Sequence, residues 1–159
     1  SVRVGGDMMD EAILQYIKQK YNLLIREHTS ELIKITIGNA YMGGKVQRMQ
    51  TKGRDLVSGI PKIIGIDSNE IHEAISVQIE EIFETVRDAL EKNPPELAAD
   101  IVEKGIVLTG GGALLKNLDK FLNEKTGLPI TVADDPLSSV VRGSEKALDS
   151  IDILRQVMI

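Results

Sequence analysis

Residues 105–118 constrain the fold of this chain more than any other stretch of the sequence. They read G-I-V-L-T-G-G-G-A-L-L-K-N-L, an apolar run followed by three consecutive glycines and a helical pattern. The run 106–108 is typical of a strand that is buried on both faces, which requires a sheet covered by helices. This strand, turn and helix therefore predict an α/β protein.

The three glycines of this turn are Gly110, Gly111 and Gly112. They remove every Cβ and allow positive φ, so a ligand such as a nucleotide can approach the backbone closely. The spacing matches neither G-x-x-x-x-G-K-[ST], which needs Lys and Ser/Thr after the last glycine, nor G-x-G-x-x-G, which needs glycine where leucine stands. A purely structural alternative, in which the glycines only let a helix pack closely on the sheet, stays open at this stage.

Hydrophobic periodicity and capping signals predict the other elements. Helix N-caps are expected at Asp7, at Thr29 or Ser30, and at Asp67, which forms a D-x-x-E capping pattern with Glu70. A turn is expected at 53–55. The expected helices cover residues 7 to about 24, 30–37, 68–90, 95–104, the segment from the glycines to about 125, and 136–148; the expected strands cover 46–52, 60–66, 106–108 and 129–132.

Composition narrows the classes of function. The 19 Lys and Arg residues against 24 Asp and Glu residues give a net charge of −5, so we expect no nucleic-acid partner. The chain has no cysteine, and its two histidines, His28 and His72, lack H-x-x-x-H spacing, so we predict no metal ligand. No Ser-His-Asp arrangement indicates a catalytic residue. Because no run reaches the roughly 18 apolar residues of a membrane span, we expect a cytoplasmic protein.

Glu31 and Lys34 form a second candidate pair for ligand binding. Their i,i+3 spacing places a carboxylate acceptor and an ammonium donor on one helix face. Such a pair can hydrogen-bond the hydroxyls of a ribose. The alternative is a solvent-exposed ion pair between the two side chains.

Several motifs, in order along almost the whole chain, resemble the MreB family of bacterial actin-like, rod-shape-determining proteins. They are SVRVGGD-x-MDEAI at 1–13, KYNLLI at 20–25, KGRDL at 52–56, PPELAADI at 94–101 and LTGGGALL at 108–115. The sequence departs from the family pattern at 26–31, where REHTSE replaces the common GERTAE, and in the loop 42–45. The first departure alters the turn that precedes Glu31.

The resemblance implies an actin-like (ribonuclease H-like) α/β fold, with two domains that close on ATP and Mg²⁺. The chain resembles the C-terminal half, in which 7–93 would be the inserted α+β subdomain IIB, and 1–6 with 94–159 would be part of the larger subdomain IIA. The resemblance also implies the nucleotide-binding residues. They would be Glu31, Leu32, Ile33 and Lys34 on the ribose and adenine side, and Gly110, Gly111, Gly112, Ala113 and Leu114 in the adenosine loop.

The function implied by the resemblance is that of an ATP-binding, self-polymerising cytoskeletal protein. It would govern rod cell shape by organising cell-wall synthesis at the inner face of the cytoplasmic membrane. Its partners would be further copies of itself, cell-wall elongation proteins and membrane-associated morphogenesis proteins. The complete family protein is an ATPase, but its phosphate loops are expected before Ser1, so we expect no hydrolysis by this chain alone. The alternatives are a sugar or acetate kinase-like phosphotransferase and an ATP-gated chaperone domain.

Overall fold

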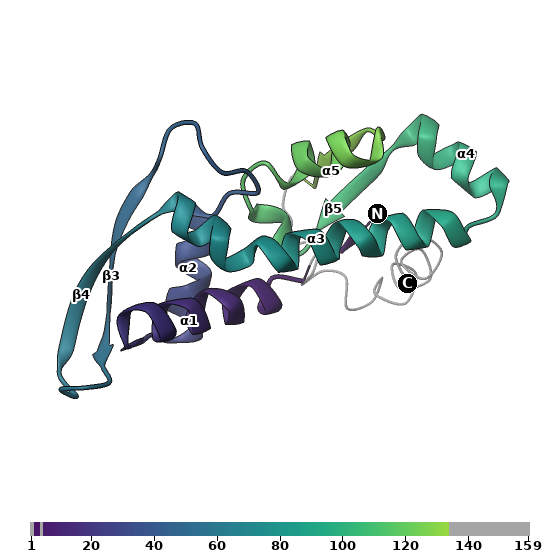
Figure 1. Cartoon of the computed structure of the whole chain (residues 1–159). Helices are drawn as coiled ribbons and strands as arrows, with labels where there is room; N and C mark the ends of the chain where they lie inside the picture. The colour runs from purple at the N-terminus through teal and green to yellow at the C-terminus, as the bar shows by residue number, and fades with distance from the viewer. Residues whose placement is uncertain (1, 4, 134–159) are drawn as a thin grey trace.

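The computed structural model describes residues 2, 3 and 5–133 (Figure 1). The helix expected over 136–148 lies outside the described residues. The helices are α1 (Asp7–Tyr21), α2 (Glu27–Ile37), α3 (Ser68–Lys92), α4 (Pro95–Lys104), the 3₁₀ helix η1 (Gly111–Leu114) and α5 (Leu118–Thr126). The strands are β1 (Val2–Arg3), β2 (Leu23–Leu24), β3 (Arg48–Asp55), β4 (Pro61–Asp67), β5 (Ile106–Thr109) and β6 (Ile130–Val132).

The described strands form two separate three-stranded sheets. The first is parallel with the order β1-β5-β6, and it places Val2 opposite Leu108. The second is antiparallel with the order β2-β3-β4, and its long β3–β4 hairpin extends from the rest of the molecule in Figure 1. Because β1 pairs with β5, the second sheet and helices α1 to α3 lie within an insertion between two neighbouring strands of the first sheet.

The apolar stripes predicted from periodicity form one continuous core. Helix α3, the longest helix in Figure 1, contacts α1, α2, β4 and α5, so it connects the two parts of the molecule. The buried apolar side chains of the three central helices are Met9, Ile13 and Ile17 of α1, Ile33 and Ile37 of α2, and Ile71, Ile75, Ile79, Val86 and Ala89 of α3. None of the helices in the described residues is both long and apolar enough to span a bilayer.

The start of α3 confirms the capping pattern predicted at Asp67. The Asp67 side chain accepts a hydrogen bond from the backbone N–H of Glu70 at 2.9 Å, and the Glu70 carboxylate accepts one from the backbone N–H of Asp67 at 3.1 Å. These two bonds satisfy backbone donors that the first turn of a helix leaves free. The helix ends at Lys92, before the predicted stop at Pro94 and Pro95.

Two predicted helix caps are wrong. The N-cap of α1 is Gly6, and Asp7 is the first helical residue and makes no capping bond. Helix α2 begins at Glu27, so Thr29 and Ser30 lie inside it. Ser30 does not cap the helix because its side chain makes a tertiary contact. Its buried hydroxyl donates to the backbone oxygen of Asp10 in α1, which fixes α2 against α1.

One turn, one strand and one helix prediction also need correction. The hairpin turn follows Asp55 instead of occupying 53–55, because the Asp55 carboxylate accepts from the backbone N–H of Val57 at 2.7 Å and shapes the turn there. This hydrogen bond holds the pKa of Asp55 below its usual range. Strand β5 is buried on one face only, since Val107 is 38% exposed. The segment after the glycines is not one helix: η1 ends before Asn117, whose φ of 64° precedes α5.

Candidate functional site

Three segments that are distant in sequence meet at Gly6: the junction of β1 and α1, helix α2, and the glycine loop (residues 110–112), whose last two residues begin η1. A Cβ atom built on Gly6 would lie 2.3 Å from Lys34 Nζ and 3.2 Å from the backbone nitrogen of Gly112. A side chain at this position would therefore require the end of Lys34 to shift and the Gly111–Gly112 backbone to give slightly. The structure therefore brings together the two candidate ligand-binding segments that the sequence predicted, through a residue that the sequence analysis did not single out.

Lys34 is buried and pairs with Asp10, not with Glu31. Its side chain is only 1% exposed, its Nζ lies 2.8 Å from Asp10 Oδ1, and it donates to the backbone oxygen of Gly6 at 3.5 Å. The predicted alternative, an exposed pair between Glu31 and Lys34, does not form. Burial raises the pKa of Asp10, against the opposing effect of the Lys34 ammonium. This partner could not be predicted from the sequence, because an acid in the first turn of a helix is ordinarily explained by the helix dipole.

Glu31 lies one turn before Lys34 and lines a cavity between the first turns of α1 and α2. Its side chain is half-buried, and within the described part of the chain its carboxylate has no hydrogen bond or ion pair. It can therefore accept hydrogen bonds from a ligand. The cavity has a volume of about 350 Å³, and its lining consists of Asp7, Asp10, Glu11, Glu27, His28 and Glu31.

The other predicted site residues divide into exposed, half-buried and buried positions. Leu32 is 51% exposed, whereas the side chains of Ile33 and Ala113 are buried in the core. Gly110 has a φ of 89°, while Gly111 and Gly112 lie in η1, and Leu114 is half-buried. Positive φ is thus required at Gly110 alone among the three glycines. The loop can present backbone to a ligand, but neither Ile33 nor Ala113 can present its side chain.

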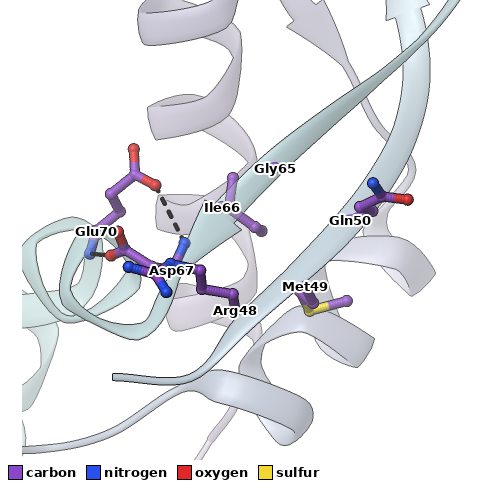
Figure 2. Close-up of a pocket in the computed structure, with 7 residues that line it drawn as sticks. All are labelled: Arg48, Met49, Gln50, Gly65, Ile66, Asp67 and Glu70. Atoms are coloured by element: carbon purple, nitrogen blue, oxygen red, sulfur yellow. Dashed lines mark hydrogen bonds between the residues drawn. The ribbon is translucent and has the colours of Figure 1, made fainter. Parts of the chain in front are cut away.

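A second pocket lies at the junction of β3, β4 and α3 (Figure 2). Its volume is about 480 Å³, and its lining consists of Arg48, Met49, Gln50, Gly65, Ile66, Asp67 and Glu70. Its two carboxylates are already engaged in the capping box, which Figure 2 shows as dashed lines. Glu70 also accepts from Lys20 at 2.5 Å. The two carboxylates of this pocket are therefore already engaged, and none of its lining residues belongs to either predicted ligand-binding segment, so we favour the site at Gly6.

Solved structures with the same arrangement of elements define the class of protein. MreB5 of Spiroplasma citri bound to ADP matches with a TM-score of 0.78 and 38% identity, over 92% of this chain and 44% of that chain. The same protein bound to AMPPNP matches with a TM-score of 0.79 and 33% identity, over 95% of this chain and 52% of that chain. A MamK double helical filament shares the fold, with a TM-score of 0.68. The chain has an actin-like α/β fold.

Sequence comparison identifies the family within this class. The MreB/Mbl protein family matches residues 1–156. The cell shape-determining protein MreB of Escherichia coli (strain K12) is 52% identical over 153 residues, and Mbl of Bacillus cereus is 43% identical over 154 residues. The chain belongs to the MreB/Mbl family, which confirms the resemblance seen in its motifs. It spans 44% and 46% of these two relatives, and its placement in the C-terminal half stays a prediction.

Proposed function

We propose that this chain is part of an ATP-binding protein that polymerises with itself and governs rod cell shape by organising cell-wall synthesis. One observation carries the proposal: the family match extends over residues 1–156, and relatives that match 96% and 97% of the chain are named cell shape-determining proteins. Because the chain spans less than half of those relatives, the activity belongs to the complete protein. The subdomains we propose are IIB for 7–93, and part of IIA for 1–6 with 94–159.

We infer that the nucleotide binds beside Gly6, between α2 and the glycine loop. Glu31 would accept hydrogen bonds from the ribose hydroxyls, and the adenine would lie against the backbone of residues 110–114. Two features support this placement: the half-buried Glu31 carboxylate is unpaired within the described residues, and the close approach at Gly6 holds the two segments together. That structures of MreB5 contain ADP and AMPPNP is consistent with such a site.

We assign Mg²⁺ to the phosphates of the nucleotide and to other parts of the complete protein. Within residues 2, 3 and 5–133, no group of three or more His, Cys, Asp or Glu side chains is arranged to hold a metal ion. The acids around the 350 Å³ cavity therefore serve as hydrogen-bond acceptors in this proposal. Mg²⁺, when bound, would neutralise phosphate charge.

We further propose that the filaments lie at the inner face of the cytoplasmic membrane, where cell-wall elongation and membrane-associated morphogenesis proteins would be their partners. The names of the relatives support a role in cell shape. Fluorescence microscopy of the tagged complete protein in its own cells checks this, with a peripheral distribution expected. A uniform distribution through the cell in rod-shaped cells would contradict it.

Sedimentation of the complete protein tests polymerisation. We expect Mg-ATP to transfer the protein into the ultracentrifuge pellet above a threshold concentration, and we expect it to stay in the supernatant without nucleotide. A protein that stays monomeric across concentration and salt would contradict the proposal. ATP turnover stimulated by a small hydroxylated or carboxylated substrate, without filaments, would instead indicate the kinase-like alternative.

A further inference from the structure

We propose that Lys34 is a positioning residue of the nucleotide site, whose buried ammonium fixes α2, and with it Glu31, against the β1–α1 junction and the glycine loop. The inference rests on the proposed nucleotide function and assigns Lys34 a different task from Glu31. It replaces the expectation that both side chains contact the ribose.

The partners of the Lys34 ammonium lie inside the protein. The side chain is 1% exposed, its charge is paired with Asp10 at 2.8 Å, and it also donates a hydrogen bond to the backbone oxygen of Gly6 at 3.5 Å. Glu31, one turn earlier on the same helix, lines the cavity instead. A ligand in that cavity can reach the carboxylate of Glu31, whereas it would have to displace Asp10 to reach the Lys34 ammonium.

The position of Lys34 is coupled to the glycine loop through Gly6. The Cβ that Gly6 lacks would fall 2.3 Å from Lys34 Nζ, 3.2 Å from the nitrogen of Gly112 and 3.3 Å from the carbonyl carbon of Gly111. Lys34 and the loop thus both border the same point of the β1–α1 junction. A shift of the Lys34 ammonium would therefore alter the packing of α2 against Gly6 and the glycine loop.

The charge of the Lys34 ammonium helps to hold the carboxylates of Asp10 and Glu31 in place. The Asp10 carboxylate is buried, and the nearby charges of Glu31 and Asp7 repel it. Lys34 is the cation that offsets this repulsion, and a buried charge that loses its partner is strongly unfavourable. Removal of the Lys34 charge would therefore move Asp10, Glu31 or both, so that Glu31 no longer meets the ribose in the productive geometry.

The test measures ATP affinity of the complete protein well below its melting temperature, with a thermal melt of every variant. We expect Lys34→Met to weaken ATP binding about tenfold, which corresponds to about 1.4 kcal/mol. The double variant Lys34→Met with Asp10→Leu removes both charges and fills the space with apolar atoms, so we expect affinity to recover to within about threefold of the wild type. A folded double variant that stays as weak as Lys34→Met would show direct contact of Lys34 with the nucleotide and overturn the proposal.

A second pair of variants leaves both charged side chains in place. Gly6→Ala inserts a Cβ where the ammonium lies, and we expect it to weaken ATP binding as Lys34→Met does. Gly5→Ala is the matched control, because a Cβ on Gly5 meets nothing within 4 Å. Wild-type affinity in either Gly6→Ala or Lys34→Met would overturn the proposal, as would a lower melting temperature of Lys34→Met without any loss of affinity. If the wild-type protein itself binds no ATP, the proposed function fails instead.

Discussion

At the scale of single residues, Glu31 and Lys34 differ in burial, although their spacing predicted that both would bind the ligand. Glu31 is half-buried and unpaired within the described residues, while Lys34, three positions later, is 1% exposed and paired. The i,i+3 rule predicted a shared helix face, and both residues do lie toward α1. It could not predict the pairing, because the partner Asp10 lies in another helix, and only packing of α1 on α2 brings it to Lys34.

Glu31→Ala in the complete protein should weaken ATP binding by about 1–3 kcal/mol, the range for one charge-assisted hydrogen bond. The loss should be smaller for 2′-deoxy-ATP, since part of the bond that Glu31 makes would already be missing. Titration calorimetry with both nucleotides measures the difference. Glu103→Ala, at an exposed position of α4, is the control and should bind like the wild type. Unchanged affinity in Glu31→Ala would remove Glu31 from the nucleotide site.

At the scale of secondary-structure elements, the N-terminus of α3 is fixed to the C-terminal end of α1 by Glu70. Its carboxylate accepts from Lys20 at 2.5 Å, from the Tyr21 hydroxyl and from the backbone N–H of Asp67. Burial alone would raise the pKa of Glu70, but these hydrogen bonds outweigh it and hold the pKa below its ordinary value. Burial and the bond to Glu70 raise the pKa of Tyr21 to about 12.

Glu70→Gln should lower the free energy of unfolding by about 1–2 kcal/mol at pH 7, a figure that allows for solvent screening at half-exposed Lys20. Because the folded pKa of Glu70 is depressed, its contribution is present above the ordinary carboxyl pKa of 4.5 and is lost as the pH falls through the folded value. Urea unfolding at several pH values should therefore show the two proteins converging in acid. Glu73→Gln, at an exposed position one turn along α3, should leave stability unchanged. Equal stability of Glu70→Gln and the wild type at pH 7 would contradict this role.

The core face of α3 provides a second prediction for this element. Ile75 is fully buried and Val77 is 62% exposed, two residues apart on the same helix. Ile75→Ala should cost about 2–5 kcal/mol, because it leaves a cavity among α1, α2 and α3. Val77→Ala should change stability by no more than about 0.5 kcal/mol. Chemical denaturation of both variants provides the comparison, and similar losses would mean that the helix buries a different face.

Element type was predictable wherever a signal was local. The apolar period of 3.6 located α1 and α3, and the Asp67–Glu70 capping box and the Pro94–Pro95 pair set the limits of α3. The start of α2 was misplaced because Ser30, a good cap residue, is used in a bond between helices. The end of β3 was misplaced because the turn depends on Asp55, two residues beyond the glycine that suggested a turn.

At the scale of the whole molecule, polar contacts add to the continuous apolar core where the inserted part meets residues 116–124. Lys116 donates to the backbone oxygen of Thr36 at 2.5 Å, and the Tyr41 hydroxyl donates to Glu124 at 2.5 Å. The Tyr41 ring also packs edge-on against Phe121, at 6.0 Å between centroids. The loop after α2 is thereby held against α5.

Tyr41→Phe should reduce stability by about 0.5–1.5 kcal/mol, since it keeps the ring contact and removes the hydrogen bond. Burial and the bond to Glu124 raise the pKa of Tyr41 to about 12. The contribution is therefore complete below pH 10 and disappears as the pH rises through about 12, so wild type and variant should converge in strong alkali. Thermal melts across this range measure the difference. A variant as stable as the wild type at neutral pH would mean that this bond does not hold the two parts together.

The fold of the whole molecule was predictable from the family motifs, and the α/β class was predictable from the strand–glycine–helix unit alone. The candidate site was predictable only as two separate segments. The residue that joins them, Gly6, looked like an ordinary helix start, and its importance comes from atoms 28 and more than 100 positions away. Such a contact leaves no pattern in a single sequence.

The pairing of β1 with β5 has a consequence for how the chain folds during its synthesis. Val2 leaves the ribosome more than 100 residues before its partner Leu108, so the pairing of β1 with β5 cannot form until the inserted sheet and helices have been synthesised. Closing so long a loop slows folding of the first sheet. Once α1 and α2 have packed, however, Gly6 is already fixed beside Lys34, and β1 is held next to the place where the glycine loop will arrive. An insertion that folds before β5 is synthesised would leave only a short-range docking step between β1 and β5.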